Sequence, residues 1–365
     1  MNKFKQGNYT RVIAFFLVAV TLICTFGFAA EGWQPEKNED DSGKIDNSSD
    51  ETDNNKENAP SSPEIYVPEF INVITGLETT EELSRNKTIC FVMDATSPLY
   101  GISDSDMIIE LPIEDGNTRL SVFTSNYKIL GKVGSITKTR GYISNLAKYF
   151  GAILISTGYD DTVDYESADV SSSHFDLSQN VGYHYTEYTH FTYTNGALIT
   201  AGLSNTNIGA ASTKRTNLPY IFNEFGNEKI LGSIQARSVT LHYSDSSETA
   251  LYYSDSDNKY IMSRNGTVKT DMLTDSAVSF DNAFVLFSDS VTYESSTSSQ
   301  LVLGTSDGGD GYYFTEGTAI PITWVVDASG NMKFLSEKGE ALIINRGTSY
   351  IGFMKSSMMD KLTIS

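Results

Sequence analysis

Cysteine is almost absent from this chain of 365 residues. The two thiols belong to Cys24, which lies in an apolar N-terminal stretch, and to Cys90. The rest of the chain therefore keeps a single cysteine, which excludes an intrachain disulfide there. Cys90 lies in the apolar run Ile89–Met93. We expect it to be a small buried side chain and not a catalytic thiol.

Positive charge is also scarce. The chain has 26 Lys and Arg residues against 46 Asp and Glu residues, which gives a formal net charge of -20. A surface of this sign repels phosphate backbones and anionic lipid headgroups. We therefore expect no nucleic-acid partner.

Long apolar runs are confined to the N-terminus. The stretch Val12–Ala30 follows Lys3, Lys5 and Arg11, which is the order found in secretory signal peptides and signal anchors. About 19 residues are just enough for a helix to span roughly 30 Å of hydrocarbon. Cleavage and retention as an anchor therefore both remain open. Lipidation at Cys24 is a third possibility, which Ile23 disfavours because a small residue is required there.

Residues 1–30 are thus predicted to be a signal peptide or signal anchor that directs the protein to the outer face of the cell membrane or into the medium. The shortage of cysteine fits a bacterial envelope, and we expect a Gram-positive host. Residues 31–64 follow as an acidic segment, with ten acidic residues against three lysines between Glu36 and Glu64. Such a segment cannot bury enough apolar surface to offset its ordering entropy, so we expect a disordered linker.

The remaining length predicts two domains. In the first, residues 65–235, short apolar runs predict strands at Ile89–Met93, Met107–Leu111, Leu120–Thr124 and Ala152–Ile155. Apolar residues at helical spacing predict a helix over Ile143–Phe150, capped by Gly151. We interpret Gly158–Ala211 as loops with one tyrosine-rich strand. Leu218–Phe225 is predicted to be a second helix, because Gly226 stands where a helix would end.

The second predicted domain, residues 236–356, is mainly β. Turn residues separate its apolar runs. The expected strands are Val239–Tyr243, Leu251–Tyr253, Tyr260–Arg264, Ala283–Phe287, Gln300–Leu303, Gly311–Phe314, Ile322–Val326, Ala341–Asn345 and Tyr350–Phe353. A mixed α/β domain followed by a mainly β domain places the chain in the α+β class.

Templates for common chemistry are missing. The chain has no nucleophile elbow, P-loop or dinucleotide fingerprint, and we predict no cofactor. His184 and His190 would lie roughly 20 Å apart on one strand, with Glu187 facing the other way, so we predict no metal site there. The segment Asp307–Gly311 lacks the ligand series of a calcium loop and is interpreted as a turn.

Two sets of charged residues in the first domain are candidate sites. Glu110 and Asp115, with Arg119, could supply the paired carboxylates of a glycan hydrolase. Alternatively, these groups form ion pairs that fix a loop.

Positive charges of the same domain could instead bind an anion. Arg119, Lys138 and Arg140 gather basic charge in an acidic protein. Arg140 precedes the predicted helix, where free N–H groups favour an anion. We predict that these side chains hold an anionic ligand, unless Arg140 only satisfies a nearby acidic loop.

Several segments carry a family resemblance. In the first half they are Thr75–Leu77, Val92–Asp94, Gly101–Glu110, Thr118–Arg119 and Arg140–Tyr142. In the second half they are Tyr260, Arg264, Asp271, Asp281–Val285, Gly309–Phe314, Ile322–Trp324 and Gly347–Ile351. In order and spacing, from about residue 72 to residue 356, they resemble the DUF3048 family, the YerB-like bacterial envelope lipoproteins of unknown function. The resemblance implies a two-part domain and supplies no reaction.

The chain departs from the family pattern at two polar positions. Gly134 stands where the family usually has an arginine, and Arg215–Leu218 replaces a Pro-His-Asn stretch without its histidine. Asn217 is the remaining polar group of that stretch and is a candidate ligand-binding residue. These losses, together with the missing catalytic templates, favour a non-catalytic binding module for an anionic wall polymer or an envelope protein. The envelope glycan hydrolase is the alternative, and the sequence leaves open whether any reaction is catalysed.

Overall fold

The computed structural model describes residues 65–160, 173–188, 190–208, 218–294, 299–304 and 308–365. Residues 63–365 form one compact unit. Of the described residues, 45% are strand and 14% are helix, which confirms the predicted α+β class. No helix of the described residues is long and apolar enough to cross a membrane. The apolar stretch at residues 12–30 lies outside the described residues.

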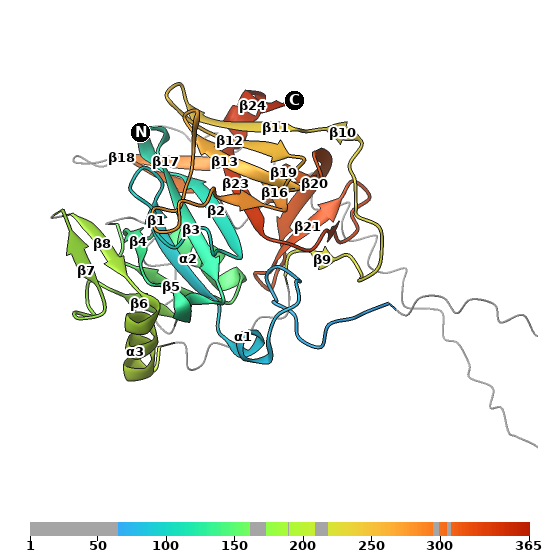
Figure 1. Ribbon diagram of the computed structural model, residues 1–365. Helices are drawn as coiled ribbons and strands as arrows, with labels where there is room; N and C mark the ends of the chain where they lie inside the picture. The colour runs from blue at the N-terminus through green and yellow to red at the C-terminus, as the bar shows by residue number, and fades with distance from the viewer. Residues whose placement is uncertain (1–64, 161–172, 189, 209–217, 295–298, 305–307) are drawn as a thin grey trace, which may run out of the picture. The chain divides into compact units, whose positions relative to one another are not determined.

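The α-helices of the described residues all lie in the first half of the chain, together with the parallel strand pairs β1–β5 and β5–β6 (Figure 1). Its helical elements are α1 (Glu81–Arg85), η1 (Glu114–Gly116), η2 (Tyr127–Ile129), α2 (Gly141–Tyr149) and α3 (Gly196–Thr206). Its strands are β1 (Ile89–Asp94), β2 (Met107–Pro112), β3 (Thr118–Thr124), β4 (Val133–Ile136), β5 (Ile153–Ser156), β6 (His174–Asp176), β7 (Tyr185–Glu187) and β8 (Phe191–Thr194).

Apart from the short helix η4, the described regular elements of the second half are strands. Its elements are β9 (Ile221–Phe222), β10 (Ile234–Gln235), β11 (Ser238–Ser244), β12 (Ser247–Ser254), β13 (Lys259–Arg264), β14 (Thr267–Val268), β15 (Ser279–Phe280), β16 (Asn282–Ser288), β17 (Ser290–Glu294), β18 (Ser299–Leu303), β19 (Gly308–Thr315), β20 (Thr318–Val326), β21 (Met332–Ser336), β22 (Ile343–Ile344), β23 (Ser349–Lys355), η4 (Ser356–Lys361) and β24 (Leu362–Ile364).

One large sheet joins the two halves. Its order is β10-β20-β19-β16-β23-β2-β3-β1-β4-β8-β7, with β5 beside β1, β6 beside β5 and β21 beside β20. The junction is the parallel pair β2–β23, in which Ile108 lies opposite Tyr350. The two predicted domains therefore do not form separate sheets.

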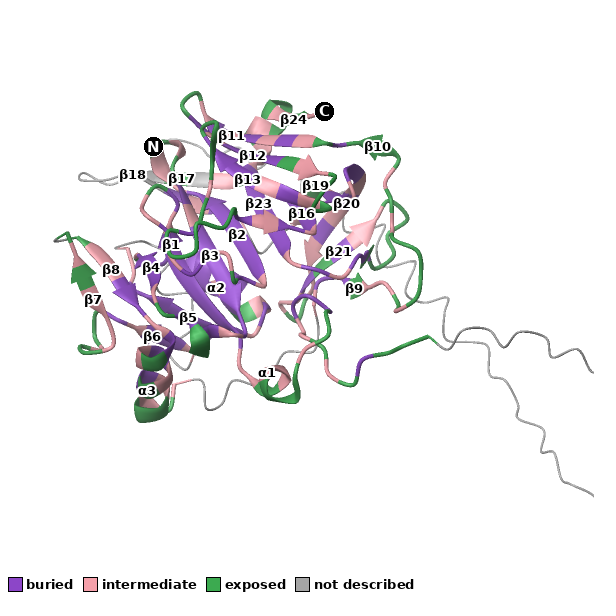
Figure 2. Ribbon diagram, viewed as in Figure 1, coloured by how far each residue is buried: buried purple, intermediate pink, exposed green. Residues whose placement is uncertain are grey.

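A second sheet, β14-β13-β12-β11-β24 with β15 beside β13, covers one face of the large sheet. Side chains of the large sheet alternate between two cores, as expected for strands buried on both faces. Phe91, Ile108 and Val285 pack with Leu241 and Met262 of the second sheet. On the other face, the opposite set from the same strands packs with helix α2 and with β21; this set includes Val92, Ile109 and Phe284. Figure 2 shows that the strands at the junction are buried along most of their length.

Both cores therefore draw on both halves of the chain. The pairing of β2 with β23 joins the halves in one sheet, so neither half has a complete sheet of its own. The predicted domain boundary at residues 235 and 236 stays a prediction.

The strand predictions and the helix predicted over Ile143–Phe150 are mostly confirmed, whereas one predicted helix and one predicted loop region were wrong. Leu218–Phe225 is extended and contains β9, because Ile221 pairs with Ile343 and the carbonyl of Pro219 accepts a hydrogen bond from Phe334. The stretch interpreted as loops contains helix α3, which is capped by Asn195. The tyrosine-rich strand is a hairpin, β7–β8.

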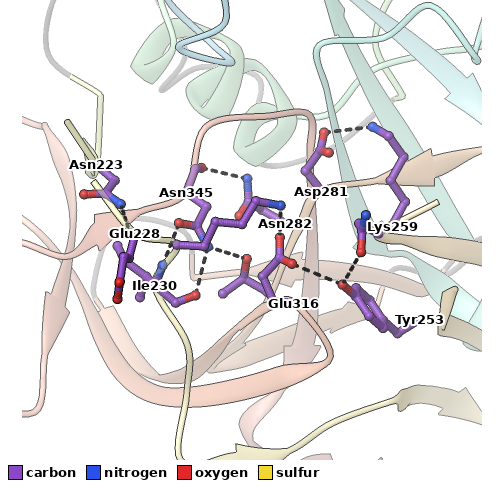
Figure 3. A network of polar contacts seen from close by, with 12 residues as sticks. Asn223, Glu228, Ile230, Tyr253, Lys259, Asp281, Asn282, Glu316 and Asn345 are labelled. Carbon is purple, nitrogen blue, oxygen red and sulfur yellow. Dashed lines mark hydrogen bonds and ion pairs between the residues drawn. The ribbon is translucent and has the colours of Figure 1, made fainter. Parts of the chain in front are cut away.

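The segment that connects the halves is fixed by polar contacts. The side chain of Asn345 accepts a hydrogen bond from the N–H of Ile230 and donates one to its carbonyl, both at 2.9 Å. The same amide donates to Thr315, and Asn282 donates to the carbonyl of Asn345 (Figure 3). Asn345, in the loop after β22, therefore fixes the connecting segment at Ile230 to the second half.

Candidate functional site

Glu110, a predicted catalytic carboxylate, is completely buried between the two sheets. Its Oε1 atom accepts hydrogen bonds from Thr118 at 2.6 Å, Arg264 at 2.6 Å and Thr249 at 3.0 Å. Its Oε2 atom accepts one from Tyr350 at 2.7 Å. Burial, and after it the negative charge of Glu110, raises the pKa of Tyr350 well above its usual value, so this hydroxyl stays protonated and donates.

Arg264 completes this network from strand β13. Besides Glu110, its guanidinium donates to Thr118, Thr249 and Ser247. The network thus links β2, β3 and β23 of the large sheet to β12 and β13 of the covering sheet. Buried charges of this kind are retained only when hydrogen bonds and an opposite charge satisfy them.

The other two members of the predicted catalytic set lie elsewhere. Asp115 is exposed in the η1 turn with φ of 58°. Arg119 forms an ion pair with Asp160 at 2.5 Å. Glu110 and Arg119 therefore belong to two separate ion pairs, and the three residues do not surround a common cleft. This geometry does not support the hydrolase interpretation, because a glycosidase needs two carboxyl groups that face one open sugar site.

Arg140 is also occupied. Its Nη1 and Nη2 atoms donate to the two oxygens of Glu114 at 2.5 and 2.6 Å, which is a bidentate pair. Nε donates to Asp160 at 3.1 Å, and Nη1 also donates to the carbonyl of Leu301. Although burial disfavours its charge, the hydrogen bonds to Glu114 raise the pKa of Arg140. This arrangement agrees with the alternative interpretation, in which Arg140 only satisfies a nearby acidic loop.

The predicted anion site is therefore not assembled in the described residues. Asp160 joins Arg119 and Arg140 through one carboxylate, so the two guanidinium groups neutralise acids of the protein itself. Lys138 is exposed, whereas Asn217 lies outside the described residues. The binding of an anionic ligand by Arg119 and Arg140 stays a prediction, and in this structure both side chains are paired with local carboxylates.

Gly134 shows that one departure from the family pattern is built into the backbone. Its φ is 138°, and a Cβ atom placed there would lie 2.7 Å from the carbonyl oxygen of Thr192. No arginine side chain fits at this position without a shift of strand β8. This chain therefore has no equivalent of that arginine.

The antiparallel hairpin β7–β8 lies beside His184 and His190, the histidines considered above as metal ligands. Glu187, the third residue of that set, instead pairs with Lys132 at 2.8 Å. The Lys132 ammonium also lies 3.9 Å from the ring centre of Tyr100 and 4.1 Å from that of Tyr193. This cation is thus held by aromatic faces and one carboxylate, which fixes the hairpin.

Cys90 is fully buried, as predicted. Burial raises the pKa of its thiol well above the usual range. The thiolate, which is the nucleophilic form, is therefore disfavoured at neutral pH.

A cavity of about 570 Å³ is the candidate ligand site. It lies between the segment before α1, the β9 segment and strand β21. Its walls are mostly apolar and include Ile71, Val73, Leu218, Tyr220, Phe222 and Phe334. A cavity of this size and composition is typical of small-molecule sites.

The polar groups of the cavity are few and belong to the turn before β21. Asp327 accepts hydrogen bonds from the N–H groups of Ser329 and Asn331 and pairs with Lys333 at 3.1 Å. These bonds, led by that of Asn331, lower the pKa of Asp327 to about 2. Asp327 is thus ionised at neutral pH and paired with Lys333, and the rest of the lining is mostly apolar, so the cavity favours an apolar group.

No prediction from the sequence placed a ligand site at this cavity. A signal was available in the continuous apolar run Leu218–Phe222, which is also consistent with a buried strand. The opposing wall comes from residues 327–335, more than 100 positions away, and no local pattern relates the two.

The buried pair can be tested by substitution. Arg264→Met leaves the Glu110 carboxylate buried without its charged partner, so we expect the free energy of unfolding to fall by about 3–5 kcal/mol. Urea denaturation at pH 7 measures this loss. The double variant Glu110→Leu with Arg264→Met removes both charges and is expected to recover part of the stability. Arg237→Met, at a half-exposed pair with Asp255, is the control and should change stability by less than about 1 kcal/mol. Similar small losses for both single variants would contradict the assignment.

The Glu114–Arg140 pair predicts a pH dependence. Burial raises the pKa of Glu114, but hydrogen bonds from Arg140 and from the N–H of Leu301 outweigh it and hold the pKa below its usual value. A carboxyl with a lowered folded pKa contributes stability that is present above its unfolded pKa of about 4.3 and is lost as pH falls through the folded pKa. Glu114→Gln should therefore be less stable than the parent at pH 7, with a difference that shrinks below about pH 4. Urea unfolding from pH 3 to pH 7 measures this, with exposed Glu337→Gln as the control. A difference that stays constant with pH would show that Glu114 acts without its charge.

Comparisons with known proteins agree with this architecture. Residues 74–209 match the N-terminal domain, and residues 239–351 the C-terminal domain, of the family described as "Protein of unknown function (DUF3048)". The crystal structure of the YerB protein from Bacillus subtilis is similar to this chain, with a TM-score of 0.68 and 19% identity over 81% of this chain and 99% of that one. At this identity the likeness shows the fold alone. No curated protein sequence matches the chain. The two matches together span more than half of the chain, which therefore belongs to the DUF3048 family.

Proposed function

We propose that this protein is a non-catalytic binding module, exported to the outer face of a bacterial cell envelope, which holds an apolar group of an envelope molecule in the cavity beside β9 and β21. The observation that carries this proposal is the contrast between the polar residues of the protein and its apolar cavity. Glu110 and Arg140, which were predicted as site residues, are hydrogen-bonded to other residues of the protein. The cavity, in contrast, is lined by apolar side chains.

Exposed isoleucines at the cavity support the proposal. Ile71 and Ile221 both line it and are 37% and 54% exposed. Ile343, the register partner of Ile221, is 49% exposed. Contiguous exposed apolar surface of this kind commonly marks a binding site.

Filling the cavity should abolish binding. The compact unit and both cores lie within the chain from residue 65 onward, so this fragment is the test protein. We expect it to bind the neutral apolar probe N-phenyl-1-naphthylamine, with a rise in fluorescence. Ala341→Trp adds bulk at an exposed lining position and should weaken binding at least about tenfold, which corresponds to about 1.4 kcal/mol. Leu273→Trp, at an exposed position that does not line the cavity, is the matched control. Equal binding by both variants would refute the cavity as the site.

The cellular location is tested separately. Added protease should cleave residues 31–365 in intact cells of a host without an outer membrane, because the N-terminal apolar stretch directs the chain outward. Immunoblotting follows the loss of the folded region, and a cytoplasmic protein serves as the intactness control. Digestion only after lysis would place the protein inside the cell. Lipid labelling that is lost in Cys24→Ala would identify lipidation as the mode of attachment.

A further inference from the structure

Arg346 differs from the other arginines of the described residues. Each of the others is paired with a carboxylate of the protein; they are Arg85, Arg119, Arg140, Arg237 and Arg264. Arg346 forms no ion pair with a described residue. Its Nη1 atom donates to the carbonyl of Gly76 at 2.7 Å, while its Nε atom is buried without a hydrogen-bond partner. In a protein of net charge -20, a partly buried guanidinium without an acidic partner is unexpected.

The guanidinium is held by aromatic rings. Its Cζ atom lies 3.7 Å from the ring centre of Phe225 and 5.5 Å from that of Phe222. Stacking on one face leaves the edge of the planar fork available to an acceptor. Because Nη1 is bonded to Gly76 and Nε is buried, Nη2 is the donor left for a ligand. A charged N–H donor of this kind binds an oxygen of a carboxylate or a phosphate.

Phe222 connects Arg346 to the apolar cavity. The Phe222 ring lines the cavity and also contacts the arginine. A Cβ atom at Gly76 would lie 2.7 Å from the Phe222 ring and 2.9 Å from Nη1 of Arg346, so the three groups are packed together. Val73, a lining residue, is three positions from Gly76. The unpaired cation therefore lies against Phe222, a wall residue of the cavity, although Arg346 itself is not a lining residue.

The backbone around Arg346 is rigid. Asn345 is fixed by the contacts in Figure 3, and the N–H of Gly347 donates to the carbonyl of Thr75 at 2.8 Å. A side chain on a fixed backbone, stacked on an aromatic ring, loses little further freedom when it binds an anion.

We propose that the cavity and Arg346 together form a site for an anionic single-chain amphiphile, in which the alkyl chain fills the apolar cavity and a carboxylate or phosphate headgroup binds Nη2 of Arg346. This inference rests on the proposed function and adds the class of ligand. Fatty acids and alkyl phosphates share the required chemistry. Lys333, a cation that lines the cavity, is already paired with Asp327.

The test compares headgroups on one alkyl chain. The fragment from residue 65 is titrated with dodecanoate, dodecyl phosphate, dodecan-1-ol and dodecyltrimethylammonium, each below its micelle concentration and in displacement of the naphthylamine probe. Using this fragment keeps the carboxylates of residues 31–64 out of the assay. We expect the two anions to bind at least about tenfold more tightly than the alcohol. The preference should weaken as salt is raised. The relative affinity of dodecanoate and dodecyl phosphate distinguishes a fatty acid from a phosphate-bearing lipid.

The variants separate this inference from the proposed function. Arg346→Gln should lose the preference for anions and keep the affinity for dodecan-1-ol, whereas Arg346→Lys should keep part of the preference. Arg237→Gln is the matched control, because Arg237 also lies over an aromatic ring, that of Tyr253, but is paired with Asp255. An unchanged melting temperature shows that each variant is folded.

Two outcomes would overturn the inference and leave the proposed function intact. One is equal binding of the anions and the alcohol to the parent protein, and the other is an anion preference that survives in Arg346→Gln. Tighter binding of an acidic leucine-rich peptide than of dodecanoate would assign the site to a protein partner and reject the amphiphile. Failure of all probes, including the neutral one, would refute the proposed function as well.

Discussion

A carboxylate and a guanidinium buried between two sheets destabilise a protein unless every remaining donor and acceptor finds a partner. Glu110 and Arg264 meet this condition through the hydroxyls of Thr118, Thr249 and Tyr350, which come from both sheets. The network is satisfied in one relative position of the sheets, because a shift of one residue along a strand would turn its side chains to the opposite face. The packing of both halves of the chain depends on this arrangement.

The segments that carry the family resemblance have a structural explanation. Glu110, Arg264 and Tyr350 belong to the buried network, and Asp271 accepts hydrogen bonds from Ser103 at 3.0 Å across the two halves. Within the second half, Asp281 accepts a hydrogen bond from the N–H of Thr348 at 2.8 Å. These residues stabilise the fold, so a resemblance based on them identifies an architecture and not a reaction. Family members could therefore share this fold while differing in what they bind.

The sequence was sufficient for features encoded locally. Alternating or continuous apolar runs predicted most strands, and the stripe through Ile143, Leu146 and Phe150 predicted helix α2. Features set by distant contacts were not recoverable. The extended conformation at residues 218–225 depends on β22 and β21, and the pairing of Arg140 with Glu114 depends on a turn 26 residues away. Arg346 carries no local mark either, because its environment comes from Gly76 and Phe225.

The pairing of β2 with β23 also constrains when the protein can fold. Tyr350 bonds to Glu110 across 240 positions of the chain, and both cores need strands from either side of that gap. Native contacts of such long sequence separation form slowly, because a large loop must close before they stabilise the product. The N-terminal half therefore emerges from synthesis without the strand that completes its sheet. Only after β23 has been synthesised can both cores close around the large sheet.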